Sequence, residues 1–124
     1  MGYVTLDRLW KTGDTIALDL PIETRRVVAD AKVADARRRV AIERGPLVYC
    51  LEWPDTDGGH ALDALVESSA PLQASVDKSL YGGVTVIETR ASRVSKPSVP
   101  AATVKLIPYY LWANRGAGEM TVWL

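Results

Sequence analysis

Short apolar runs separated by turn residues are the feature that most constrains the fold of this chain. In the clearest run, TIALDL at residues 15–20, Ile16, Leu18 and Leu20 share one face of an extended backbone. A period of two is typical of a half-buried strand and not of a helix. The run before it, residues 3–10, also alternates, and the turn residues KTGD at 11–14 lie between them. The pattern predicts a β-hairpin over residues 3–20.

The same pattern continues along the chain with very little helix propensity. Residues 30–38 are the exception, and they are too short for a stable helix, so we expect a loop there with one helical turn. The spacing predicts an all-β fold, an antiparallel β-sandwich of the jelly-roll type with about eight or nine short strands. Strands are expected at 3–10, 15–20, 22–28, 39–44, 47–52, 72–76, 84–89, 103–108 and 120–124, with 62–66 ambiguous.

One of these runs differs from the rest because it is apolar on both faces. In LVYCLE at residues 47–52, Tyr49 and Leu51 point one way and Val48 and Cys50 the other. A strand with two apolar faces is typical of the centre of a covered sheet.

Length and composition exclude several classes of protein. The chain has 124 residues, which predicts a single domain over 1–124, and its fifteen basic and fifteen acidic residues cancel. A zero net charge argues against nucleic acid or an anionic membrane as the partner. No apolar run approaches the roughly 20 residues of a membrane span, and no signal peptide is visible, which favours a cytoplasmic location. One cysteine and one histidine cannot build a zinc site without carboxylates or a partner chain, and we expect no metal or cofactor in this chain.

Other chemical motifs have structural interpretations. The DTDGG run at residues 55–59 lacks the remaining ligands of a calcium loop, so it is interpreted as a surface turn. Glu43, Glu52 and Glu88 could supply a glycosidase carboxylate pair, but outward-facing carboxylates are common on strands. Cys50 is interpreted as a small buried hydrophobe and not as a nucleophile.

Two basic clusters and the histidine are also interpreted as structural. The arginines at 25–26 and 37–39 could bind an anion, but we expect them to be solvated or paired with nearby acids such as Asp30 and Asp35. His60 follows two glycines and is expected to be a solvated loop side chain.

The segment IPYYLWANRG at residues 107–116 concentrates aromatic and polar side chains. Aromatic rings can stack on the apolar face of a sugar while amide and guanidinium groups bond its hydroxyls, although buried tyrosines and tryptophans are also common core anchors. Both interpretations stay open, with Trp53 in the preceding loop as a further aromatic candidate. The candidate carbohydrate contacts are Tyr109, Tyr110, Trp112, Asn114 and Arg115.

Four stretches of the chain resemble one family. IPYYLWANRGAGEMTVWL at 107–124, GYVTLDRLWKTGDTIALDLP at 2–21, VAIERGPLVYCLE at 40–52 and GGVTVIETR at 82–90 are similar to the C-terminal end of glycoside hydrolase family 127, which includes bacterial β-L-arabinofuranosidases. The resemblance covers nearly the whole chain. It implies that the chain is a β-sandwich region near the C-terminus of a longer hydrolase with a catalytic (α/α)6 barrel.

The resemblance also implies where the chemistry takes place. In the family a zinc-held cysteine nucleophile and a glutamate acid/base belong to the barrel, and none of their motifs lies in the matched region. Cys50 falls in a sandwich motif, so no residue of this chain is expected to be catalytic and zinc is expected only in the absent catalytic domain.

Three functional hypotheses follow. The preferred one is a non-catalytic domain that supports the catalytic barrel of the same polypeptide. The second is a carbohydrate-binding module that uses the aromatic segment. The third is a homodimerisation module that pairs edge strands between chains.

Overall fold

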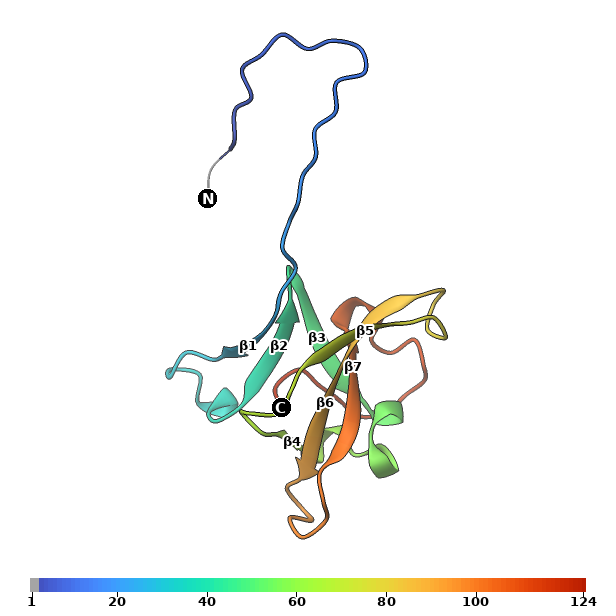
Figure 1. The fold of residues 1–124 in the computed structure, drawn as a ribbon. Coiled ribbons are helices and arrows are strands. Elements are labelled where there is room, and N and C mark those ends of the chain that lie inside the picture. The colour runs from blue at the N-terminus through green and yellow to red at the C-terminus, as the bar shows by residue number, and fades with distance from the viewer. Residues whose placement is uncertain (1–2) are drawn as a thin grey trace.

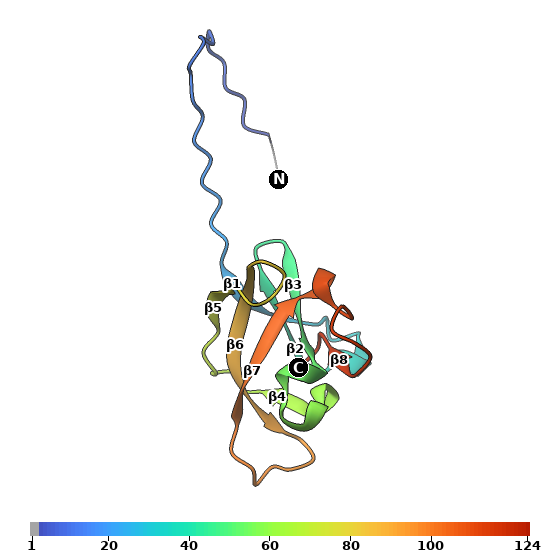
Figure 2. The ribbon, with the colours of Figure 1, turned by 90° about the vertical axis from the view of Figure 1, so that its right-hand side faces the viewer.

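The computed structural model describes residues 3–124, and the first two residues of the expected 1–124 domain lie outside the described residues. Residues 3–23 form an extended arm without strands, which projects away from a folded body that begins at residue 24 (Figures 1 and 2).

The body is built from antiparallel strands. Their order in the sheet is β1-β2-β3-β7-β6-β4, with β5 paired to β6 and β8 paired to β3. The strands are β1 (Thr24–Val28), β2 (Val40–Arg44), β3 (Leu47–Glu52), β4 (Ala64–Val66), β5 (Gln73–Asp77), β6 (Val84–Arg93), β7 (Ala102–Pro108) and β8 (Met120–Thr121).

The all-β prediction is confirmed. The described strands belong to one sheet that curls into a half-barrel, so the arrangement of two sheets in a sandwich is not confirmed (Figure 1). Helical structure is limited to single 3-10 turns, and one of them, Ala34–Ala36, is the helical turn expected in residues 30–38. The others are Trp53–Asp55, Asp57–Gly59, Ala61–Asp63 and Tyr109–Leu111. None of the helices in residues 3–124 is long and apolar enough to cross a membrane.

Strand β3 is buried on both faces, as its sequence predicts. Tyr49 and Leu51 belong to the larger hydrophobic cluster, which also contains Leu106 of β7. Cys50, between them in sequence, belongs to a smaller cluster on the opposite face with Ile107. The buried Tyr49 hydroxyl donates a hydrogen bond to the Thr85 carbonyl (3.1 Å), so its polar end is satisfied inside the core.

The predicted hairpin over residues 3–20 is not formed, and this prediction is wrong for the structure described. Only its turn is present: the Asp14 N–H donates to the Lys11 carbonyl (3.1 Å), and Gly13 has a positive φ of 95°. An isolated two-stranded hairpin is marginal in water, and no other strand lies beside the arm to stabilise it. The turn residues at 11–14 therefore form the predicted turn, whereas the alternation on either side of it does not lead to strand pairing in this structure.

The C-terminal strand is shorter than predicted. Only Met120–Thr121 is a strand, rather than 120–124. The end of the chain is nevertheless held to the sheet, because Leu124 and Val40 exchange two backbone hydrogen bonds of 2.9 Å. Leu124 is buried in the larger core, so the last residue contributes to packing.

The buried thiol provides a test of the double-sided burial of β3. Burial raises the pKa of Cys50 to about 12, and the negative charge of Glu52 acts in the same direction. Because the thiolate is the reactive form, we expect no reaction of folded protein with Ellman's reagent at pH 8, whereas protein unfolded in urea reacts fully. Equal reaction rates for the folded and unfolded protein would contradict the burial of this strand.

Candidate functional site

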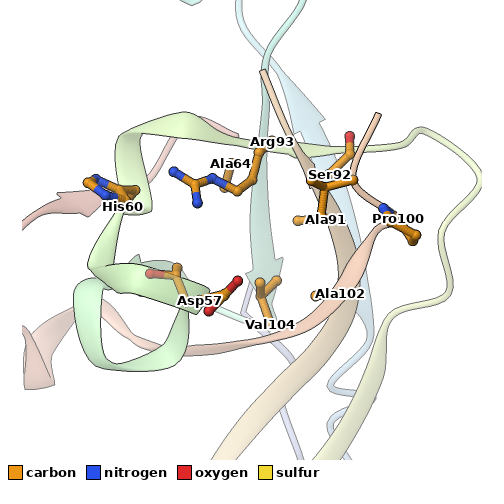
Figure 3. A pocket seen from close by; sticks show the side chains of 11 residues that line it. Asp57, His60, Ala64, Ala91, Ser92, Arg93, Pro100, Ala102 and Val104 are labelled. Atoms are coloured by element: carbon orange, nitrogen blue, oxygen red, sulfur yellow. The ribbon is translucent and has the colours of Figure 1, made fainter. Parts of the chain in front are cut away.

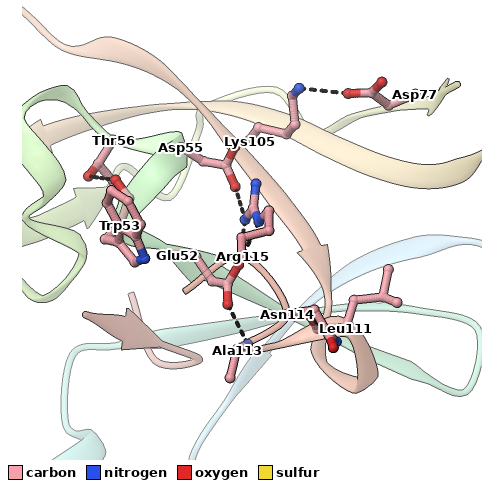
Figure 4. Close-up of polar contacts among 10 residues, drawn as sticks. All are labelled: Glu52, Trp53, Asp55, Thr56, Asp77, Lys105, Leu111, Ala113, Asn114 and Arg115. Carbon is pink, nitrogen blue, oxygen red and sulfur yellow. Dashed lines mark hydrogen bonds and ion pairs between the residues drawn. The ribbon is translucent and has the colours of Figure 1, made fainter. Parts of the chain in front are cut away.

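Arg115 lies at the centre of the polar cluster beside the aromatic segment (Figure 4). Its guanidinium donates to Glu52 Oε2 through Nε (2.8 Å) and Nη2 (2.6 Å), and Nη2 also donates to Asp55 Oδ2. The other Glu52 oxygen, Oε1, accepts the Ala113 N–H at 2.7 Å. We call Glu52, Asp55 and Arg115 the arginine clasp. It ties the end of β3 to the loop after Tyr109–Leu111.

The clasp is buried, which makes its charge balance important. The Glu52 side chain is 3% exposed and that of Arg115 is 17% exposed. Burial alone disfavours a charged guanidinium, but the hydrogen bonds to Asp55 and Glu52 outweigh it and raise the pKa of Arg115 above its ordinary value. Both carboxylates therefore face a permanent positive charge inside the protein.

The loop between the aromatic residues and Arg115 is fixed by its own hydrogen bonds. Asn114 Nδ2 donates to the carbonyl of Leu111 (3.0 Å), and the backbone at Ala113 has a positive φ of 66°. The Ala113 N–H is the donor that reaches Glu52. Asn114 thus closes the turn that brings the Ala113 N–H and the Arg115 guanidinium to Glu52.

The three aromatic side chains of the segment lie at the surface. Tyr109 is 44% exposed, Tyr110 is 63% exposed and Trp112 is 45% exposed. The rings of Tyr109 and Trp112 stack, with centroids 6.0 Å apart and an interplanar angle of 17°. The segment therefore presents a pre-arranged aromatic surface beside the clasp.

Three glycines lie next to the indole ring of Trp53. A Cβ on Gly118 would lie 2.1 Å from the Trp53 ring, and Gly116 and Gly59 also approach it. Only glycine allows so close an approach, so the GAG run at residues 116–118 accommodates the indole. The indole Nε1 is buried without a hydrogen-bond partner.

The five predicted carbohydrate contacts thus occupy two environments. Tyr109, Tyr110 and Trp112 are exposed, whereas Asn114 and Arg115 already have partners within the chain. Contact of any of them with a carbohydrate stays a prediction.

The expectation that Glu52 faces outward is wrong, because it is 2% exposed. The burial of Glu52 could have been predicted from the sequence, because alternation along β3 puts Glu52 on the same face as the buried Cys50. Glu43 pairs with Arg25 across the β1–β2 ladder at 2.8 Å, as expected of a strand carboxylate.

The basic clusters find partners other than those expected. Arg25 binds Glu43, Arg26 donates to the Ala70 carbonyl, and Arg39 donates to the Trp123 carbonyl at 3.0 Å. None of the ion pairs found within residues 3–124 joins these arginines to Asp30 or Asp35. Arg25 and residues 37–39 are exposed, as the solvated interpretation predicted, whereas the alternative of pairing with Asp30 or Asp35 is not found.

A small cavity lies between the 3-10 turns and strands β6 and β7 (Figure 3). Its volume is about 40 Å³, and Asp57, His60 and Arg93 supply its polar lining. This volume is enough for a water molecule but far below that of a pocket for a sugar. His60 is half-exposed, with Nδ1 3.7 Å from Glu119 Oε1, close to the solvated position expected for it.

Two further carboxylates have structural partners near these sites. Hydrogen bonds from Lys105 and Ser79 lower the pKa of Asp77 to about 2. Hydrogen bonds from Ser95, with a smaller contribution from Arg93, lower the pKa of Asp63 to about 2. Both groups are ionised at neutral pH and are occupied in joining strands and loops.

Removal of the guanidinium tests the role of the clasp. We expect Arg115→Met to destabilise the fold by about 3–5 kcal/mol, because it leaves Glu52 charged and uncompensated in the interior. Urea unfolding followed by tryptophan fluorescence measures the change.

The matched control is the double variant Glu52→Gln with Arg115→Met. It keeps an oxygen for the Ala113 N–H and removes the more deeply buried of the two carboxylate charges, leaving only that of Asp55, so it should be more stable than Arg115→Met alone. A single variant as stable as the wild type would show that the clasp does not hold the loop.

Comparison with known proteins identifies the family. Residues 24–124 match the family model described as the glycoside hydrolase family 127 C-terminal domain. By sequence, the chain is 35% identical over 141 residues to a non-reducing end β-L-arabinofuranosidase of Bifidobacterium longum subsp. longum. The alignment covers 98% of this chain and 21% of that protein, so the chain spans about a fifth of the length of this relative.

Solved structures agree with the sequence match. A GH127 β-L-arabinofuranosidase from Geobacillus stearothermophilus T6 superposes with a TM-score of 0.71 at 36% identity, covering 83% of this chain and 18% of that one. A GH127 β-arabinofuranosidase superposes with a TM-score of 0.69 at 38% identity, covering 83% and 17% of the two chains. This chain therefore belongs to glycoside hydrolase family 127, and its residues 24–124 form the C-terminal domain of that family.

Proposed function

We propose that the chain is a non-catalytic domain that packs against the catalytic part of a longer β-L-arabinofuranosidase and supports it. The arginine clasp is the observation that carries this proposal. Many glycosidases use two carboxyl groups that face the substrate, roughly 5–10 Å apart, and the family resemblance implies a cysteine nucleophile with one glutamate acid/base. Either mechanism needs at least one carboxyl group that is free to face the substrate. Glu52 and Asp55 are close together, but both bind one guanidinium, and the Glu52 side chain is 3% exposed. They are occupied in holding the fold.

The zinc centre that the family resemblance implies does not fit the residues of this chain. Within residues 3–124 no group of three or more histidine, cysteine or carboxylate side chains is placed to hold a metal ion. Cys50 is fully buried in an apolar cluster with Val86 and Ile107. We therefore assign no step of the reaction to these residues.

Activity measurements on two proteins test this assignment. We expect the longer polypeptide to hydrolyse an aryl β-L-arabinofuranoside and the isolated chain to show no turnover. Turnover by the isolated chain would contradict the proposal. In the longer polypeptide, Arg115→Met should lower the temperature at which activity is lost while leaving kcat at low temperature unchanged, since Glu52 and Asp55 already bind the Arg115 guanidinium and the clasp supports the fold.

A second candidate function, carbohydrate binding, is favoured by the stacked pair of Tyr109 and Trp112. Both rings are nearly half-exposed and are held with an interplanar angle of 17°. Stacked, exposed aromatic rings suit the apolar face of a sugar ring.

Tryptophan fluorescence tests this candidate directly. Titration with L-arabinose and arabinosides should change the emission of the wild-type chain, and Trp112→Ala should abolish that change. Trp10→Ala is the matched control, because Trp10 is also about half-exposed but lies on the arm. An unchanged spectrum at millimolar sugar would exclude binding at the aromatic segment.

A further inference from the structure

The N-terminal arm carries a strand pattern that nothing among residues 3–124 satisfies. Ile16 is 59% exposed, Leu18 is 78% exposed and Leu20 is 65% exposed. The arm rises from the body, reverses direction and runs back without contacting the sheet (Figures 1 and 2). So many exposed apolar side chains in one segment indicate a surface that is covered in its functional setting.

The reversal of the arm is encoded locally. The Asp14 N–H donates to the Lys11 carbonyl, and the Lys11 N–H donates in turn to Asp14 Oδ2 at 2.8 Å. Arg8 also binds Asp14, with Nη2 3.0 Å from Oδ2. A turn closed by backbone, side chain and ion pair brings the two halves of the arm into antiparallel order before either half has a partner.

The turn also favours one strand register. A three-residue loop at 12–14 keeps the observed turn hydrogen bond and places Trp10 opposite Ile16. The same register places Leu6 opposite Leu20. Because side chains of a strand alternate, these four lie on one face of the hairpin. A two-residue loop would instead split the apolar side chains of the two strands between opposite faces.

The base of the arm is attached firmly to the body. The Gly45 N–H, in the turn between β2 and β3, donates to the Glu23 carbonyl at 3.1 Å. The side chain of Ile22 lies over Gly45, where even a Cβ would approach it to 2.9 Å. The arm therefore leaves the domain at a fixed point, and its residues lie in the region that follows on from the start of β1.

We propose that residues 3–20 form a β-hairpin that adds two strands to a sheet in the part of the longer polypeptide that precedes this chain, with its apolar face against the core of that part. The family model for the C-terminal domain begins at residue 24, whereas the sequence match to the Bifidobacterium enzyme includes the arm. The arm is thus shared with a full-length relative but lies outside the C-terminal domain. A covalently connected sheet is favoured over a second copy, because tethering raises the effective concentration of the partner.

This inference rests on the proposed place of the chain in a longer polypeptide, and amide hydrogen exchange tests it. In the isolated chain at low concentration, the amides of residues 15–20 should exchange at nearly the unfolded rate. In the longer polypeptide they should exchange roughly 100-fold more slowly or better, since paired strand amides are protected. Equally fast exchange in both proteins would overturn the proposal. So would protection in the isolated chain that rises with concentration alongside a dimer, because the partner would then be a second copy.

Two neighbouring substitutions test the face assignment in the longer polypeptide. Leu18→Asp puts a charge on the apolar face and should abolish the protection of residues 15–20. Ala17→Asp adds the same charge one residue earlier, on the opposite face, and should leave the protection within about twofold of the wild type. Equal losses in both variants would overturn the assigned face.

The hydrogen-exchange experiment tests the hairpin independently of the activity measurement that tests the non-catalytic role. Turnover by the isolated chain would contradict the non-catalytic role but would not change the exchange rates of the arm. An unprotected arm in an active longer polypeptide would overturn the hairpin and leave the non-catalytic role intact.

Discussion

The burial of β3 on both faces is the constraint on which the rest of the structure depends. Tyr49 and Leu51 anchor the larger core, and Cys50 anchors the smaller core on the other side. A strand with two apolar faces requires neighbours along both edges and cover above and below. The β2 and β7 ladders supply the edges, and β8 continues the pairing at the far end. Glu52, at the end of this strand, is buried for the same reason, and its charge makes the arginine clasp necessary.

Patterns that are decided by burial could be predicted from the sequence. The strands β2, β3, β6 and β7 lie where the sequence predicts strands, from alternation in β2, two apolar faces in β3 and β-branched residues in β6. Their side chains pack against the core that these patterns imply. The hairpin at 3–20 shows the same alternation and does not pair. The difference is physical: alternation describes a face that must be covered, but it carries no information about which part of the polypeptide covers it.

In the candidate site, too, some features could be predicted from the sequence and others could not. The inward direction of the Glu52 side chain follows from alternation along β3, so its burial could be predicted from the sequence. Its partner was not, since Arg115 lies 63 residues further along the chain. The choice of Arg115 over the clusters at 25–26 and 37–39 depends on a turn fixed by Asn114. Long-range ion pairs of this kind are decided by the tertiary fold, which a single sequence does not show.

The arm and the body therefore differ in where their apolar side chains are satisfied. The body buries a core of its own, which includes Leu106 and the terminal Leu124, and its exposed apolar side chains, such as Val28 and Val94, lie apart from that core. The arm begins to expose its apolar side chains immediately beyond the contact between Ile22 and Gly45, which is also where the C-terminal family model begins. A boundary found independently in the packing and in the sequence family marks the end of one cooperative folding unit. On our proposal, the apolar side chains of the arm stabilise the neighbouring unit by packing against its core. The contact between Ile22 and Gly45 holds the covalent link between the two units in place.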